Sequence, residues 1–263
     1  MSSDSHFGIP IIELPTNSKD LDGGSDEWRS LCKSVREACE NHGCFQVVYH
    51  KISSHLQHEL FSLIRQPFNL PLETKKQNVK SKPLHGYYEP GGDFLPFYES
   101  FGLEDASSCN SSKASPNLMQ IHHHNHFYYQ LRRVMKYSAP PSGEYTNVVS
   151  AHRDGEWVKL CMPPGTFVFI YGDLLNAWSN GRMHAANHRV MSRRNEYRYS
   201  LGTFAVPVKG TIIKAAKEMV DEEQPRVFKD TNFMDFVDYA NAGGSLLFDS
   251  EAVLICCSTQ KLS

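Results

Sequence analysis

The sequence lacks the features that would place the protein outside the cell or in a membrane. Its seven cysteines are odd in number and never spaced C-x-x-C, which argues against a zinc or redox motif and against a complete disulfide framework. The N-terminus, MSSDSHFG, has neither the basic start nor the apolar run of a secretory signal, and no stretch of roughly 18 apolar residues occurs that could span a bilayer. We therefore expect a reduced, cytoplasmic protein.

An excess of charge of one sign is also missing. Lys and Arg total 27 against 29 Asp and Glu, a formal charge of -2, so no overall positive field attracts phosphate backbones or anionic lipid. Nucleic acid and membrane surfaces are not expected as partners. The 263 residues, 40% hydrophobic and 21% charged, suffice for one large globular domain or two small ones. Histidine is plentiful, with 13 residues, four of them in the run HHHNH (His122, His123, His124 and His126).

The first third of the chain predicts a short edge strand and two amphipathic helices. The run IPIIEL at 9–14 is apolar but contains proline, which is typical of an edge strand. Apolar residues recur at helical spacing over 26–42, and a second helix opens at Ser54 and ends at Pro67, with the strand CFQVVYH between the two helices. From about 70 to 120 the sequence is rich in Pro, Gly, Ser and Lys, which we interpret as an extended wrap across a core.

The remainder of the chain has the pattern of short strands separated by turns. The strands are YYQLRRVMKY, GTFVFIYGD, HRVM and RYSLGTFAV, with a hairpin at VVSAHRDGEWVKL. They favour an antiparallel sandwich or barrel, followed by one or two helical turns at AAKEMVDEEQP and a helix at NFMDFVDYANAGG.

The chemistry-bearing residues concentrate between 171 and 206. His188 and Arg198 are predicted on neighbouring strands, and Arg198 and Ser200, two residues apart, face the same way. A guanidinium inside a sheet needs an anionic partner, and its planar fork suits a carboxylate, to which a serine hydroxyl adds a donor. The residues themselves therefore indicate a carboxylate pocket beside a metal-ligand histidine.

Several of these motifs, taken together and in this order, resemble the plant Fe(II)/2-oxoglutarate-dependent dioxygenases, an isopenicillin N synthase-like family. The resemblance rests on IPIIEL, REACENHGCFQVVYHKIS, HGYYEPGGDFLPFYESFGL, LRRVMKYSAP, WSNGRMHAANHRVM and RYSLGTFAVP. It covers the chain to about Gly243 and is strongest for the group that contains the dioxygenases of glucosinolate side-chain oxidation and of auxin oxidation.

The resemblance implies a fold, cofactors and a site. The fold is α+β, mainly β, with an incomplete double-stranded β-helix (jelly-roll) core, an N-terminal helical region and a C-terminal helix. His188 matches the distal histidine of the triad that holds Fe(II), Arg198 and Ser200 match the pair that binds the distal carboxylate of 2-oxoglutarate, and Tyr137 matches a tyrosine that assists them. The implied activity oxidises a small plant metabolite or hormone with release of succinate and CO2, with ascorbate as reductant.

The sequence departs from the family where the other two metal ligands belong. No H-x-D motif follows MKY on the next strand; only His152-Arg153-Asp154 has this spacing, and Asp154 belongs to the DGEW hairpin. We interpret this triplet as a fortuitous hairpin sequence, which leaves His188 as the one assigned metal ligand. The HHHNH run stands where the family has a long helix, and we interpret it as a solvated loop rather than an iron site.

Three functional hypotheses and three regions follow. The chain is an Fe(II)/2-oxoglutarate dioxygenase, or a catalytically silent relative that at most binds 2-oxoglutarate or a protein partner, or an enzyme in which His152 and Asp154 complete the triad. The expected regions are an N-terminal dioxygenase region at 1–117, a shortened jelly-roll domain at 118–210 and a C-terminal helical tail at 211–263.

Overall fold

The computed structural model describes residues 8–17, 23–78, 86–90, 97–103, 128–138, 148–153, 156–191 and 196–242. Their contacts group the chain into two compact units. Unit 1 combines Met1–His58, Asn147–Met191 and Ile212–Ser263, and unit 2 combines Glu59–Thr146 and Ser192–Thr211. Each unit is therefore assembled from segments that lie far apart in the sequence.

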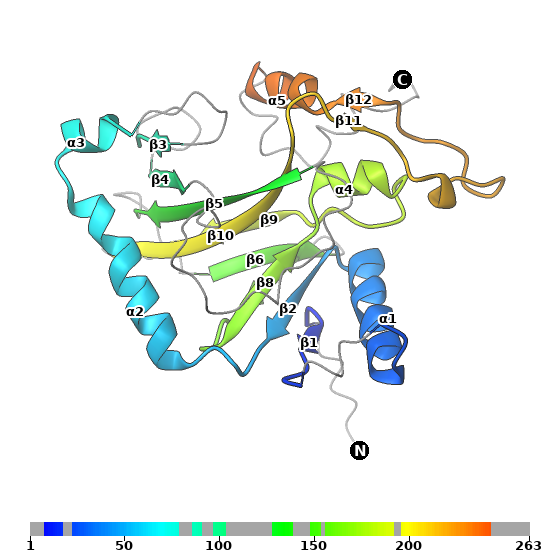
Figure 1. Ribbon diagram of the computed structural model, residues 1–263, viewed down its shortest axis with the longest axis horizontal. Helices are drawn as coiled ribbons and strands as arrows, with labels where there is room; N and C mark the ends of the chain where they lie inside the picture. Colours follow the sequence, from blue (N-terminus) through cyan, green and yellow to red (C-terminus); the bar gives the residue numbers. More distant parts are fainter. Residues whose placement is uncertain are drawn as a thin grey trace. The chain divides into compact units, whose positions relative to one another are not determined.

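The first sheet of unit 1 has β2 (Cys44–Val48) at its centre. Strand β1 (Ile11–Glu13) pairs with β2 in parallel, and β8 (Thr166–Ile170) pairs with it antiparallel on the other side. Helix α1 (Asp26–Asn41) lies beside β1 and β2 (Figure 1). The helix begins at Ser25, whose hydroxyl accepts a hydrogen bond from the Trp28 amide at 3.0 Å and so satisfies a donor of the first turn.

Helix α1 and this sheet enclose the main core of unit 1. The helix turns Ala38 and Cys39 inward, and the stretch after α4 contributes Ala186 from much later in the chain. Each large apolar side chain buried here contributes about 1.5–3 kcal/mol to stability. The buried members are Ile9, Ile12, Ala38, Cys39, Cys44, Phe45, Leu160, Tyr171 and Ala186.

A second sheet in unit 1 has the order β7-β6-β9. Strands β6 (Val148–Arg153) and β7 (Glu156–Leu160) form an antiparallel hairpin, and β9 (His188–Met191) pairs with the other edge of β6. This arrangement places His188 at the start of a strand whose outer edge has no partner strand among the described residues.

The C-terminal part of unit 1 packs on the short helix α4 (Asp173–Trp178). Phe228 is 1% exposed and contacts Ala177 of α4, with Ile213, Val227 and Phe236 around them. The elements of this part are β11 (Ile212–Ile213), the 3-10 turn η4 (Lys217–Met219), β12 (Thr231–Asn232), which pairs with β11, and α5 (Phe233–Ala242).

Unit 2 is an antiparallel sheet of four strands in the order β10-β5-β4-β3. Side chains alternate between the faces of a strand, and residues directly opposite one another share a face. Tyr137 lies opposite both Tyr98 and Arg198, so these three positions form one row on one face. The strands are β3 (Gly86–Tyr88), β4 (Tyr98–Leu103), β5 (Tyr128–Tyr137) and β10 (Arg198–Pro207).

The opposite face of this sheet carries the core of unit 2. Ile64 at the end of α2 (Ser54–Arg65) and Phe68 of the 3-10 turn η2 (Gln66–Asn69) pack against Phe101 and Val134. Partly buried Phe61, Tyr87 and Tyr199 complete the cluster.

A buried carboxylate also lies on this core face. Glu99, 6% exposed, accepts hydrogen bonds from Lys75 Nζ of α3 (Leu72–Lys76) at 2.6 Å and from the Tyr87 hydroxyl at 2.8 Å. Lys136 Nζ lies 3.5 Å from its second oxygen. The negative charge of the buried Glu99 carboxylate is therefore compensated by the two lysines.

The described elements confirm most of the expected ones. The edge strand, both N-terminal helices, the strand between them, the hairpin and the later strands lie where the patterns predict them, and helices with antiparallel sheets confirm a mixed α+β class. The expectation of an extended wrap from 70 to 120 is wrong in the described part, which contains α3, β3 and β4. The two strands are short and form through long-range pairing, β4 with β5 and β3 with β4, which local sequence does not reveal. No helix in the described ranges has both the length and the apolar character needed to cross a membrane.

Candidate functional site

Three predicted residues meet on the face of the unit 2 sheet that lies opposite its apolar core. Arg198 lies directly opposite Tyr137, with its guanidinium carbon 5.5 Å from the centroid of the phenol ring. Ser200 follows two residues later on β10, opposite Met135, and therefore on the same face as Arg198. All three side chains are half-buried. The structure thus brings Arg198, Ser200 and Tyr137 together as the sequence predicted.

The electrostatics of this face favour an anion. Burial lowers the pKa of Arg198, an effect that the neighbouring Tyr137 opposes, and no carboxylate of the described residues forms an ion pair with its guanidinium. Burial raises the pKa of Tyr137, as does Tyr98, while Ser200, Arg198 and Arg133 act in the opposite direction. The phenol therefore stays a neutral O–H donor beside a guanidinium, a combination suited to binding a carboxylate.

The same face holds residues that the sequence reasoning missed. Tyr98 stacks at a tilt on Tyr137, with ring centroids 5.3 Å apart. Ser100 is fully buried in the next row, and the guanidinium of Arg133 donates a hydrogen bond to its hydroxyl. Arg133 could have been found from the sequence, because Arg133, Met135 and Tyr137 are spaced two residues apart on one strand and therefore share a face. Tyr98 and Ser100 could be found only from the pairing of β4 with β5.

His188 lies in unit 1, at the first position of β9. Its Nδ1 is 3.1 Å from the carbonyl oxygen of Ala186, and since a carbonyl can only accept, this contact requires the proton on Nδ1. In the neutral imidazole Nε2 then carries no proton, and the side chain is exposed. A histidine that binds a metal through Nε2 typically donates its Nδ1–H to a carbonyl in this way, so His188 fits the role of one iron ligand.

Asp173 adds a carboxyl close enough to interact electrostatically with His188. It is half-buried in the first turn of α4, and burial raises its pKa, an effect that the charge of His188 partly offsets. The described residues contain no group of three His, Cys, Asp or Glu side chains able to hold a metal ion. Within the described chain, iron therefore has one assigned ligand.

The alternative ligand pair is only partly described. Position 188 lies opposite Ala151 of β6, whereas position 152 lies opposite Trp157 of β7. Asp154 and the HHHNH run at 122–126 lie outside the described residues. The interpretation of both remains a prediction.

One expected juxtaposition is wrong. His188 and Arg198 were expected on neighbouring strands, but β9 pairs with β6 and β10 pairs with β5, in different sheets. Strands that are consecutive in the sequence of a sandwich often change sheet, and only the long-range pairing decides this.

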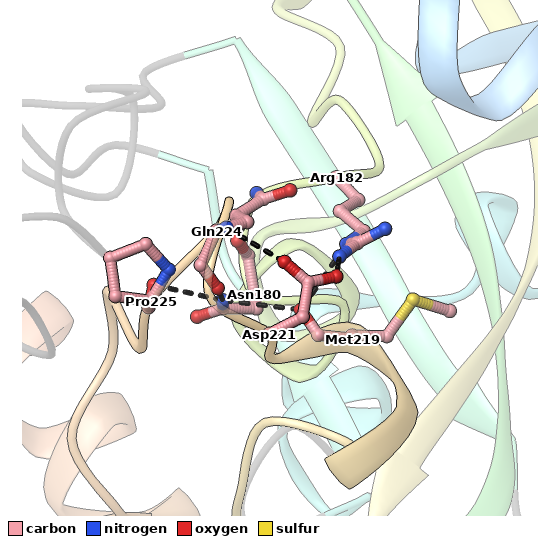
Figure 2. Close-up of polar contacts among 6 residues, drawn as sticks. All are labelled: Asn180, Arg182, Met219, Asp221, Gln224 and Pro225. Carbon is pink, nitrogen blue, oxygen red and sulfur yellow. Dashed lines mark hydrogen bonds and ion pairs between the residues drawn. The ribbon is translucent and has the colours of Figure 1, made fainter.

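The turn that leads from α4 to β9 is fastened by Asn180. Its side-chain nitrogen donates to the carbonyl groups of Met219, Gln224 and Pro225 at 3.2–3.4 Å, and its oxygen accepts from the Val227 amide at 2.8 Å. Figure 2 shows the fully buried Asn180 among Met219, Gln224 and Pro225. The SNG motif thus ties the segment carrying His188 to residues 219–227.

Arg182 and Gln224 extend this fastening. Arg182 Nε donates to the Met219 carbonyl at 3.2 Å, and its guanidinium pairs with Asp221 (Figure 2). The side chain of Gln224 donates through Nε2 to the Asn180 carbonyl at 3.0 Å, and the backbone amide of Gln224 donates to the Asp221 carboxylate at 2.8 Å. Side chains and backbone therefore lock the turn from both sides.

Comparison with known protein families identifies both parts of the chain. Residues 9–126 match the N-terminal domain described as non-haem dioxygenase in morphine synthesis, and residues 138–207 match the 2OG-Fe(II) oxygenase superfamily. The second match includes Arg198 and His188.

Curated relatives agree over most of the chain. A probable 2-oxoglutarate-dependent dioxygenase AOP1.2 of Arabidopsis thaliana is 29% identical over 299 positions, covering 89% of this chain and 91% of the relative. The 2-oxoglutarate-dependent dioxygenase DAO of Oryza sativa subsp. indica is 27% identical, covering 86% and 93%. An alignment of 299 positions exceeds the 263 residues of this chain, so the relative contains residues that this chain lacks.

Solved structures agree in fold. The crystal structure of the rice dioxygenase for auxin oxidation superposes with a TM-score of 0.73 at 24% identity, covering 95% of this chain and 100% of that chain. A binary complex of the Arabidopsis thaliana dioxygenase for auxin oxidation 1 with 2-oxoglutarate gives 0.65 at 25% identity, covering 83% and 100%. Together with the two family matches, these relatives confirm the resemblance read from the motifs: the chain belongs to the Fe(II)/2-oxoglutarate-dependent dioxygenases.

Proposed function

We propose that this protein is an Fe(II)/2-oxoglutarate-dependent dioxygenase that oxidises a small plant metabolite or hormone and releases succinate and CO2. The observation that carries the proposal is the half-buried Arg198, which shares a sheet face with Tyr137 and Ser200 and pairs with no carboxylate of the described residues. A dicarboxylic keto acid satisfies this set, because one carboxylate can accept from the guanidinium, the phenol and the serine hydroxyl.

The described residues fit 2-oxoglutarate and one bond to Fe(II). Arg198, Ser200 and Tyr137 bind the distal carboxylate of 2-oxoglutarate, and His188 binds the metal through Nε2. When bound, Fe(II) supplies the redox chemistry that activates O2, with ascorbate as the family's reductant. The chain's own contribution is to hold the keto acid and to fix the tautomer of His188.

The core of the enzyme is, in this proposal, an incomplete jelly roll. Strands β8, β9 and β10 each have one edge without a partner strand among the described residues, and the aligned relative has residues that this chain lacks. A missing pair of strands accounts for both observations. We retain the proposed division into 1–117, 118–210 and 211–263, in which the middle region is the shortened domain.

A catalytically silent relative that binds 2-oxoglutarate or a protein partner is the second candidate. The observation that favours it is the absence, from the described residues, of three side chains grouped to hold a metal. The two candidates differ in turnover: stoichiometric succinate formed from 2-oxoglutarate eliminates the silent relative, whereas binding of 2-oxoglutarate without turnover supports it.

An anaerobic titration with Fe(II) and 2-oxoglutarate tests the proposal most directly. Chelation of a protein-held iron by the keto acid gives a visible charge-transfer band, which we expect in the wild-type chain and not in His188→Ala. No band in a chain that circular dichroism shows to be folded contradicts the proposal. His152→Ala then tests the alternative ligand set, because unchanged iron binding in this variant eliminates it.

We place this activity in the cytoplasm, with small molecules and neither nucleic acid nor a membrane as partners. This part of the proposal rests on the charge of -2 and on the odd number of cysteines without C-x-x-C spacing. Fractionation of plant tissue, followed by detection of the chain in the soluble cytosolic fraction or elsewhere, tests it.

A further inference from the structure

Gly43, at the junction of α1 and β2, is approached very closely by the chain that leads to His188. A β-carbon built on Gly43 would lie 2.3 Å from the carbonyl oxygen of His184 and 2.8 Å from the amide nitrogen of Ala186. Both atoms are backbone, so neither can rotate away as a flexible side chain could. Gly43 also has φ +65°, a conformation that residues with a β-carbon rarely adopt.

Other hydrogen bonds hold the same segment against the α1–β2 junction. The amide of His184 donates to the Cys39 carbonyl at 2.9 Å, and the side chain of Asn176 donates to the Met183 carbonyl at 2.6 Å. Ala186 is buried in the core that Ala38 and Cys39 form. Residues 183–186 are therefore fixed at three points, and the close approach to Gly43 is a fourth contact, which only glycine permits.

This segment ends at the atom that orients His188. The carbonyl of Ala186 accepts the Nδ1–H of His188 at 3.1 Å and so selects the tautomer with a free Nε2. A displacement of Ala186 away from Gly43 moves this carbonyl. The contact at the α1–β2 junction and the imidazole of β9 are thus joined by the short backbone segment from His184 to His188.

We propose that Gly43 is a positioning residue for His188: by seating residues 184–186 against the α1–β2 junction, it fixes the Ala186 carbonyl that holds the imidazole with Nε2 free for a metal. The proposal rests on the proposed function only in taking His188 as an iron ligand. Gly43 touches neither metal nor substrate and acts entirely through the Ala186 backbone.

The experiment compares Gly43→Ala with Gly24→Ala. Gly24 also has positive φ, +107°, but a β-carbon built there has no atom within 4 Å. Gly24→Ala therefore introduces backbone strain without displacing a neighbouring segment. Nitrogen-15 NMR of the imidazoles in the metal-free chain at pH 8 reports the tautomer of His188. We expect Nδ1–H to dominate in wild type and Gly24→Ala and to lose dominance in Gly43→Ala, with Fe(II) affinity falling about tenfold.

A loss of stability alone does not change the tautomer of the folded molecules, so this readout separates positioning from general packing. A folded Gly43→Ala with an unchanged His188 tautomer overturns the proposal. If Gly43→Ala does not fold, Asn176→Ala releases the same segment at Met183 and must shift the tautomer in the same direction; an unchanged tautomer there also overturns it.

The outcomes also separate this proposal from the proposed function. A wild-type chain with the Nδ1–H tautomer but no Fe(II) binding leaves the role of Gly43 intact and contradicts the iron site. A wild-type chain that binds Fe(II), with no change of tautomer or affinity in Gly43→Ala, supports the iron site and rejects the role of Gly43.

Discussion

Arg198 and Tyr137 lie directly opposite each other on β10 and β5, with the guanidinium carbon 5.5 Å from the centre of the phenol ring. The pair forms one row of a sheet whose other face carries the core of unit 2. Because the row is fixed by backbone hydrogen bonds and not by a loop, the two side chains are held in position before any ligand arrives.

Arg198→Gln should weaken 2-oxoglutarate binding about thirtyfold. The variant removes a charge-assisted, bidentate contact of about 2 kcal/mol and leaves the sheet pairing in place. Isothermal titration calorimetry measures the change. Arg132→Gln is the matched control, since position 132 belongs to the same sheet but to its other face, and it should bind as wild type. Equal affinities in both variants would place the carboxylate elsewhere.

Tyr137→Phe should reduce 2-oxoglutarate affinity by about fivefold to tenfold, which corresponds to about 1 kcal/mol for one neutral hydrogen bond. Burial raises the pKa of Tyr137 above its ordinary value of about 10, so this phenol keeps its proton and causes no change in affinity between about pH 7 and pH 9. Calorimetric titrations at several pH values check both statements. Tyr199→Phe, on the core face, serves as the control and should leave binding unchanged.

Glu99→Gln should destabilise the fold by about 3 kcal/mol at pH 7, because Lys75 keeps its charge in a buried position without a partner. Burial by itself raises the pKa of Glu99, but the hydrogen bonds from Lys75 and Tyr87 and the charge of Lys136 hold it below its ordinary value. As the pH falls below about 4.3, the unfolded chain takes up the proton first, so this contribution is lost as the pH passes through the folded pKa.

Urea denaturation from pH 7 to pH 3 measures this effect, and the difference between wild type and Glu99→Gln should shrink towards acid. Glu89→Gln is the control, because Glu89 pairs with Lys76 at 3.0 Å in a half-exposed position and should cost less than about 1 kcal/mol. A difference that stays constant with pH would mean that the ionised form of Glu99 is not the stabilising one.

Asn180→Ala should cost about 3 kcal/mol, because three carbonyl groups and the Val227 amide lose a buried partner. Asn180 also has φ 55°, so Asn180→Gly should be less destabilising than Asn180→Ala by about 1 kcal/mol. Urea denaturation ranks the two variants, and limited proteolysis should cut Asn180→Ala within 219–227 sooner than wild type. The reverse order of the two variants would reject the role of the backbone conformation.

Local sequence determined the elements and the chemistry of this protein. Apolar spacing and the Ser25 cap define α1, and runs bounded by turns mark β5 and β10. Two-residue spacing puts Arg198 and Ser200 on one face without reference to any distant residue. The motif WSNGRMHAANHRVM with RYSLGTFAVP indicated the family, which the comparisons confirm. Each of these features depends on neighbours within a few residues of the chain.

The tertiary structure decided which elements become partners. The pairing of β9 with β6 and of β10 with β5 separates His188 and Arg198 into different sheets. Strand β4 forms by pairing with β5, and β3 forms by pairing with β4. The role of Asn180 depends on carbonyl groups some 40 residues later, and that of Gly43 on residues more than 140 positions away. Sequence periodicity holds no information about such contacts, because they follow from register and packing between segments that meet only in the folded chain.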